Sequence, residues 1–175
     1  MERSFADCCS AVQQHIERRY GLYVVTRDIP DPLTGDLDGI EIQIDYAVTP
    51  EQRLFLLAHL FGHTVQWNVD PGAFELGKQY RPPVDEKFFP EIIAYELEAA
   101  RYGLFLLHEV AILDLDSWFS AYTAGDQAYL LHFYRTGEKR EFRDFWPASA
   151  PLLESKPVPQ FTPKKRAFRM DGIVI

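Results

Sequence analysis

Cysteine is scarce in this sequence: the chain of 175 residues has only two, the adjacent pair Cys8 and Cys9. Neighbouring cysteines rarely form a disulfide because the bond geometry is strained, and this pair lacks the C-x-x-C spacing of a zinc or redox motif. No hydrophobic run approaches the ~18 apolar residues of a membrane span. The first residues, MERSFADCCSAVQQ, lack a secretory signal pattern. We therefore expect a cytoplasmic protein with reduced thiols and no contact with a membrane.

Positive charge is also in deficit. Lys and Arg number 18 against 26 Asp and Glu, which gives a formal net charge of -8. A general nucleic-acid-binding protein needs the opposite balance to neutralise phosphates, so that class of function is not expected. The exception is the basic stretch FTPKKRAFRM, residues 161–170. Such a tail can contact an acidic partner, although a solvated tail is the commoner outcome.

Hydrophobic residues make up 47% of the chain, which is enough to build one core. Their three- and four-residue spacing predicts an amphipathic helix over 4–20, ended by Gly21, and a long helix from about 90 to 110. A further helical stretch covers about 116–134, and Gly125 predicts a break within it. The neighbouring aromatic side chains are expected in the core: Trp67, Trp118, Phe119, Tyr122, Tyr129, Phe133 and Tyr134.

Two segments have the pattern of β-strands. Residues 22–27 are rich in β-branched side chains, and residues 39–48 alternate isoleucines with polar residues, which predicts one buried and one exposed face. Residues 28–39 are dense in Pro, Gly and Asp and are predicted to form a loop. About twenty residues after Trp67 show no period and are also predicted as a loop. Together these elements predict an α+β fold with a small antiparallel or mixed sheet.

The stretch LFLLAHLFGHTVQW, residues 54–67, contains two histidines in an apolar helical pattern. Its helix is predicted to begin at Thr49-Pro50, where Gln52 can complete a capping box. His59 and His63 are four residues apart, so both imidazoles lie on one helix face and can point at one centre. Zinc-binding helices use this spacing. The spacing alone does not separate a metal site from two buried structural histidines.

A third ligand for such a metal is expected from the helix near residues 90–110. Glu96 shares a face with Ala99 (or Ala100) and Gly103, and small side chains allow two helices to pack closely. Glu91 is the competing candidate, because it also begins an E-x-x-A sequence. It lies about 140° around the helix from Glu96, so the two carboxylates cannot face the same metal. We favour Glu96.

Two segments resemble motifs of the ImmA/IrrE family of zinc metallopeptidases. GIEIQIDYAVTPEQRLFLLAHLFGH is similar to that family's strand, Ser/Thr-Pro-Glu helix start and L-A-H-E-x-G-H motif. ELEAARYGLFLL, residues 96–107, is similar to its E-x-E-A-N-x-F-A-x-x-L-L motif. The sequence differs from the second motif in three places: Ala100, Tyr102 and Gly103 replace Asn, Phe and Ala. The resemblance covers roughly residues 5–137.

The resemblance implies a zincin-like metallopeptidase domain over 1–137, followed by a Pro-rich, partly basic extension over 138–175. It assigns zinc ligation to His59, His63 and Glu96. The family's general base falls on Leu60, which has no lone pair to accept a proton. Loss of a positioned general base costs roughly 10²–10⁴-fold in rate, so no catalytic residue is assigned.

Three functions follow from these assignments. The first is a regulatory domain that retains the metal site, binds a protein or peptide partner in the old cleft and does not cleave it. The second is an active metal-dependent hydrolase with a substitute base. The third is a metal-free structural or interaction subunit, in which each histidine is hydrogen-bonded to a protein group. Glu98 is assigned a surface role or an indirect role behind a ligand. The candidates for a substitute base are Asp70, Glu75, Asp85, Glu86, His108 and His132.

Overall fold

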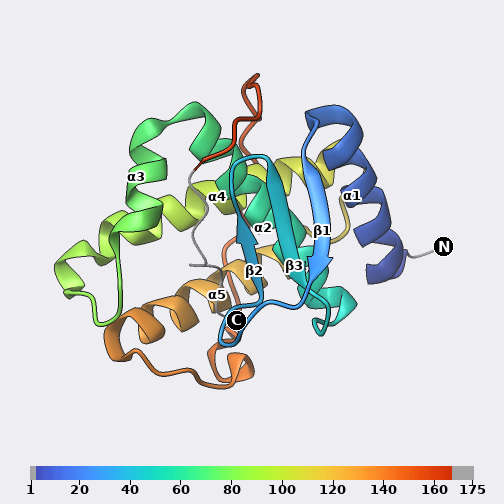
Figure 1. Ribbon diagram of the computed structural model, residues 1–175. Coiled ribbons are helices and arrows are strands. Elements are labelled where there is room, and N and C mark those ends of the chain that lie inside the picture. The colour runs from blue at the N-terminus through green and yellow to red at the C-terminus, as the bar shows by residue number, and fades with distance from the viewer. Residues whose placement is uncertain (1–2, 167–175) are drawn as a thin grey trace.

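The computed structural model describes residues 3–166, so Arg169 and the end of the predicted basic tail lie outside the described residues. The main elements, in chain order, are α1 (Phe5–Tyr20), β1 (Tyr23–Arg27), β2 (Gly35–Leu37), β3 (Glu41–Asp45), α2 (Pro50–Val69), α3 (Pro71–Gln79), α4 (Phe89–Glu109) and α5 (Asp116–Thr136). Two short 3₁₀ helices, η1 (Glu86–Phe88) and η2 (Phe142–Phe145), complete the list. Figure 1 shows the three strands on one face of the molecule, with α2 and α4 behind them and α1 beside β1. The predicted α+β class is confirmed.

The sheet is mixed, with β3 as its central strand. β3 pairs in parallel with β1, where Val24 lies opposite Ile42, and antiparallel with β2, where Leu37 lies opposite Ile42. The prediction that residues 28–39 form only a loop is wrong, because β2 lies within them. Gly and Asp have low strand preference. This short strand is therefore determined by its pairing with β3 and not by its own pattern.

The prediction of an exposed polar face on β3 is also wrong. Gln43 and Asp45 are buried, with 4% and 9% of their surface exposed. The Asp45 carboxylate accepts hydrogen bonds from the backbone N–H groups of Ile29 and Ala47, both at 2.8 Å. These bonds satisfy the buried charge and attach the segment after β1 to the central strand. The alternation identifies the strand, but β3 is covered on both faces.

The predicted starts of α1 and α2 are confirmed by their capping geometry. Ser4 caps α1 by accepting from the backbone of Asp7, and Thr49 caps α2 by accepting from the backbone of Gln52, both at 3.2 Å. Gln52 returns the bond by accepting from the Thr49 N–H at 2.9 Å, which completes the predicted capping box. α1 ends at Gly21 in the left-handed conformation that glycine adopts without strain.

The prediction of a long loop after Trp67 is wrong, because α3 lies within it. Asp70 caps this helix by accepting from the Gly72 N–H at 2.8 Å, and Pro71 occupies its first turn. α2 begins with the same pattern, a capping residue followed by proline, at Thr49-Pro50. The signal was therefore present in the sequence, although the two glycines in the helix weaken its periodic pattern.

The predicted break in the last helix is absent, because α5 is continuous through Gly125. A Cβ atom at this position would lie 3.4 Å from both the Phe142 ring and the Phe145 carbonyl oxygen. Gly125 therefore serves close packing of η2 against α5 and does not end the helix. The core assignment is confirmed for Phe119, Tyr122 and Tyr129, which are buried. The other predicted core aromatics, Trp67, Trp118, Phe133 and Tyr134, are half-buried.

The segment of residues 146–166, here called the C-terminal strap, runs along the outside of three helices. The backbone N–H of Leu153 donates to Ser120 Oγ on α5 at 3.0 Å, and that of Lys156 donates to the Arg101 carbonyl on α4 at 3.0 Å. Further on, the backbone of Lys164 donates to the last turn of α2. Among the residues described, no helix is both long and apolar enough to cross a membrane.

Candidate metal centre

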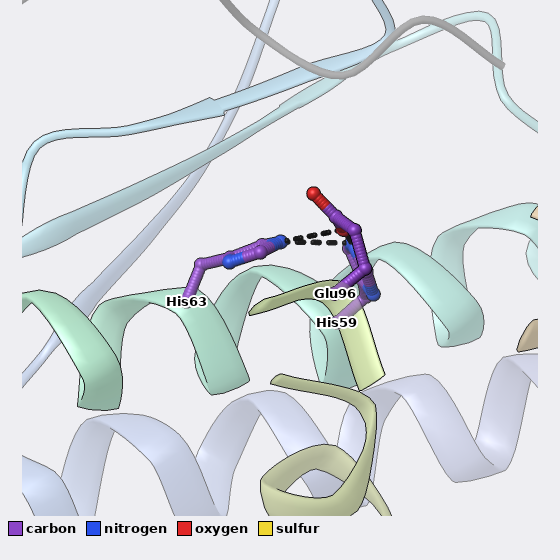
Figure 2. Close-up of side chains that lie close together, drawn as sticks. All are labelled: His59, His63 and Glu96. Carbon is purple, nitrogen blue, oxygen red and sulfur yellow. Dashed lines mark hydrogen bonds and ion pairs between the residues drawn. The ribbon is translucent and has the colours of Figure 1, made fainter. Parts of the chain in front are cut away.

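His59 and His63 of α2 and Glu96 of α4 meet in the interior of the protein. Figure 2 shows both imidazole rings and the carboxylate pointing toward one another. Glu96 Oε2 lies 3.1 Å from Nε2 of His59 and 3.1 Å from Nε2 of His63, and the two nitrogens lie 3.0 Å apart. The three residues are 2%, 4% and 7% exposed. All three ligand atoms lie within 4.8 Å of one another, so this buried cluster could hold a metal ion.

The close crossing of α2 and α4 brings Glu96 to the histidines. Gly62 of α2 lies against the backbone of Ala99, where an added Cβ atom would be only 1.9 Å from the Ala99 carbonyl oxygen. One turn away, an added Cβ on Gly103 would be 2.6 Å from the Ala58 carbonyl oxygen. The predicted stripe of small residues thus forms the contact between the helices. Glu96 lies one turn before Ala99 on α4 and reaches the cluster from there.

Glu91, the alternative ligand, lies elsewhere. Its side chain is exposed and accepts a hydrogen bond from the Tyr80 hydroxyl at 2.6 Å. Of the two acidic residues considered from the sequence, the structure therefore places Glu96 with the histidines.

Gln66, one turn beyond His63 on α2, fixes the proton on the ring of His63. Its Nε2 donates to the Tyr95 carbonyl and to Glu98 Oε2, both at 2.9 Å. Its Oε1 therefore faces His63 Nδ1, at 2.9 Å, and must accept a proton from that nitrogen. His63 Nε2 then carries a lone pair that points to the centre of the cluster.

Two ring nitrogens and one carboxylate oxygen consequently converge on this centre. The pKa of Glu96 is held well below its usual range: burial opposes this shift, but the close contacts of the carboxylate with the rings of His63 and His59 outweigh it. The carboxylate is therefore ionised. Only a proton on His59 Nε2 or a cation can satisfy a carboxylate oxygen and the lone pair of His63 together. Two imidazoles and one carboxylate are the ligand set of many zinc sites.

The ring of His59 is less fully satisfied than that of His63. Its Nδ1 is buried and has no hydrogen-bond partner among the described residues. The face of the ring stacks on Phe55, with 5.2 Å between ring centroids. The third hypothesis, of purely structural histidines, requires a hydrogen-bond partner for every ring nitrogen. Both nitrogens of His63 have one, but only Nε2 of His59 does.

Asp126 of α5 is an acidic residue near this centre that the sequence did not single out. Pairs of residues on α2 and α5 meet at successive helical turns: Glu51 accepts from Trp118 Nε1 at 2.8 Å, and Phe55 stacks on Tyr122 at 4.1 Å. One further turn along both helices pairs His59 with Asp126.

The charge environment of Asp126 agrees with this register. Burial raises the pKa of Asp126 to about 7; His59 lowers the pKa and Glu96 raises it further, so both ligand residues act on this carboxyl. The side chain is only 3% exposed. Asp126 is spaced three and four residues from Tyr129 and Tyr122 of the predicted core. An acidic residue in line with the core residues of this helix was the feature of the sequence that could have identified Asp126.

Leu60, in the position expected for the general base, is a core residue. Its side chain is fully buried and lies toward β2, since a Cβ atom added to Gly35 would be 2.8 Å from Leu60 Cδ1. It offers no hydrogen-bonding atom. The aliphatic side chain therefore packs α2 against the edge strand directly beside His59 in the chain.

The six residues considered as substitute bases are engaged away from the cluster. Asp70 and Asp85 cap helices, Glu75 pairs with Lys78, Glu86 pairs with Arg135, His108 pairs with Asp116 and His132 contacts Thr136. Glu98 has the indirect role that the sequence suggested, because it accepts from Gln66 and pairs with Lys156 of the strap.

Comparison of the chain with models of known protein families, with curated proteins and with solved structures finds no match.

Proposed function

We propose that this chain is a zincin-like, zinc-binding domain that binds a peptide or protein partner without cleaving it. The observation that carries the proposal is the convergence of His59, His63 and Glu96, whose possible ligand atoms all lie within 4.8 Å of one another in a buried site. Two ring nitrogens and one carboxylate oxygen leave a fourth position open, as in catalytic zinc sites. The resemblance to zinc metallopeptidases supports the same assignment.

The absence of cleavage follows from Leu60. When bound in such a site, zinc polarises water and carbonyl groups. Peptide hydrolysis also needs a side chain that takes the proton from the attacking water and returns it to the leaving nitrogen. Leu60 has no atom for this step. Its loss as a base corresponds to about 3–5 kcal/mol of activation barrier. The ligands are unaffected, since the missing glutamate does not bind the metal.

The zinc site is tested by metal content and affinity. We expect one Zn²⁺ per chain by elemental analysis after equilibration with zinc and removal of the excess. His59→Ala and Glu96→Gln are expected to lose this zinc. His132→Ala removes a histidine that lies outside the cluster and should retain it. Wild-type protein that binds no zinc, or His59→Ala protein that binds it as tightly as wild type, would contradict the proposal.

A second candidate function, metal-dependent hydrolysis, is favoured by the position of Asp126. A buried carboxyl with its pKa raised to about 7 by burial is suited to give and take protons near neutral pH. In this function Asp126 of α5 would act as the general base, in place of the motif glutamate whose position is occupied here by Leu60.

Cleavage of an unfolded protein by zinc-loaded samples separates the two functions. The first predicts no cleavage by wild type and a gain in Leu60→Glu. The second predicts cleavage by wild type that Asp126→Asn abolishes and the exposed-site control Asp114→Asn leaves unchanged. Thermal unfolding of each variant verifies that it is folded, because Leu60→Glu introduces a carboxylate into a packed site.

A further inference from the structure

We propose that Gln66, Glu98 and Lys156 form a hydrogen-bonded relay that fixes the tautomer of His63, and that the C-terminal strap thereby controls metal affinity. The inference rests on the proposed zinc site, and it adds a means by which a distant part of the chain acts on that site. The residues come from three segments: Gln66 from α2, Glu98 from α4 and Lys156 from the strap.

The relay begins with the orientation of one amide. An amide side chain can present either its NH₂ group or its oxygen to His63 Nδ1. The Tyr95 carbonyl and the Glu98 carboxylate are both acceptors, and both lie 2.9 Å from Gln66 Nε2. They hold the NH₂ group away from the ring, so Gln66 presents its oxygen to His63. In the reverse orientation the amide would donate to Nδ1 and move the ring proton to Nε2, which would block the metal-binding atom.

Glu98 is held as an acceptor by the strap. Lys156 Nζ donates to Glu98 Oε1, while Gln66 occupies Oε2. These two bonds occupy both carboxylate oxygens of Glu98 as acceptors.

An exposed ion pair by itself contributes little, and these two side chains are 37% and 36% exposed. Lys156, however, has two additional attachments to α4. Its backbone N–H donates to the Arg101 carbonyl at 3.0 Å, and its ammonium lies 5.0 Å from the centre of the Tyr102 ring. Its position is therefore set by the docked strap and does not depend on the ion pair alone.

The test compares two substitutions of Glu98 in the full-length chain. Glu98→Gln retains an oxygen that can accept from Gln66, whereas Glu98→Lys replaces the acceptor by a donor and favours the reversed amide. Nitrogen-15 NMR of the metal-free protein is expected to show the Nδ1–H tautomer of His63 in wild type and Glu98→Gln, and the Nε2–H tautomer in Glu98→Lys. Zinc affinity in Glu98→Lys should fall roughly 10- to 100-fold, the usual effect of losing an outer hydrogen-bond partner.

Substitutions of Lys156 test the contribution of the strap. We expect Lys156→Met to weaken zinc binding a few-fold, because the pair is partly exposed, and Lys156→Arg to restore it. Lys165→Met is the matched control: this residue of the strap pairs with Asp38 at 3.5 Å and is not part of the relay. A change in the visible spectrum of the Co²⁺-loaded protein in Lys156→Met, but not in Lys165→Met, would locate the effect at the metal.

The outcomes separate this inference from the proposed function. Zinc bound equally well by wild type, Glu98→Lys and Lys156→Met, with an unchanged His63 tautomer, overturns the relay and leaves the zinc site intact. Wild-type protein that binds no zinc but shows the Nδ1–H tautomer, lost in Glu98→Lys, overturns the zinc site and leaves the relay.

Discussion

Asp126 and Glu96 are two buried acids near one centre whose pKa values shift in opposite directions. Burial raises the pKa of Asp126 to about 7, whereas the histidines lower that of Glu96 below its usual range even though burial opposes it. The contacts explain the difference: Glu96 Oε2 lies 3.1 Å from Nε2 of both histidine rings, and no hydrogen bond lowers the pKa of Asp126. At neutral pH the first acid is ionised and the second is close to half-protonated.

This difference predicts how stability depends on pH in the metal-free protein. An acid with a raised pKa in the folded state binds its proton more tightly there than in the unfolded chain. Asp126 therefore stabilises the fold fully below pH ~4, and this contribution is lost as the pH rises to about 7. Asparagine does not ionise, so Asp126→Asn should not lose stability as the pH rises. We expect the free energy of unfolding of the variant to exceed that of wild type above pH 7 by a few kcal/mol. Urea unfolding at pH 5 and pH 8 measures this difference. Equal differences between wild type and variant at both pH values would contradict the assignment.

At the scale of a residue, the sequence predicted which three residues form the buried cluster, but not the residues that support them. His59 and His63 follow from a spacing within one helix, and Glu96 from small residues that allow two helices to meet. Gln66 lies three residues from His63 on the same helix, but the orientation of its amide depends on Tyr95 and Glu98 of α4. The position of Asp126 depends on the packing of α5 against α2, which no spacing within a single segment records. The acid within the core-facing stripe of α5 was the one local sign.

At the scale of elements, the contact between α2 and α4 is the feature on which the centre depends. Gly62 and Gly103 let the two backbones approach so closely that no side chain fits at either position. Both helices are long, and the cluster residues are distributed between them, so the separation of the helices sets the distance from Glu96 to the histidines.

Gly62→Ala is therefore expected to destabilise the protein and to weaken the centre. A Cβ atom 1.9 Å from the Ala99 carbonyl oxygen must force the helices apart, which costs about 3 kcal/mol or more. Gly103→Ala, with its Cβ at 2.6 Å from the Ala58 carbonyl oxygen, should cost less. Gly72→Ala is the control, because its Cβ would meet only the Asp70 side chain at 3.2 Å, and it should change stability by less than about 1 kcal/mol. Chemical denaturation gives the three values; Gly62→Ala as stable as Gly72→Ala would show that the crossing is not rigid.

Elements with their own periodic pattern were predicted correctly, and elements defined by their neighbours were not. α1, α2 and α4 carry apolar stripes, and the first two also have capping residues at the expected positions. β2 has three residues and exists only because β3 pairs with it. The glycine in α5 is explained by the close packing of η2 against it, and this contact is not visible in the pattern of the helix itself.

At the scale of the whole molecule, the chain is organised around one buried crossing with other elements layered on it. α1 and the sheet cover one side of α2, α4 lies against its other side, and the strap passes over α5, α4 and the end of α2 (Figure 1). Composition predicted one domain with a single core. It did not predict that the strap would be tied by backbone hydrogen bonds to three separate helices.

Lys156 follows His59, His63 and Glu96 in the chain, and this order has a consequence for biosynthesis. Proteins emerge from the ribosome N-terminus first, so α2 and α4 can assemble the trio of ligands while the strap is still inside the exit tunnel. The last support behind His63 therefore arrives after α2 and α4 have met. A chain whose strap has not yet docked and a chain whose strap has docked therefore differ in how firmly they hold the same imidazole.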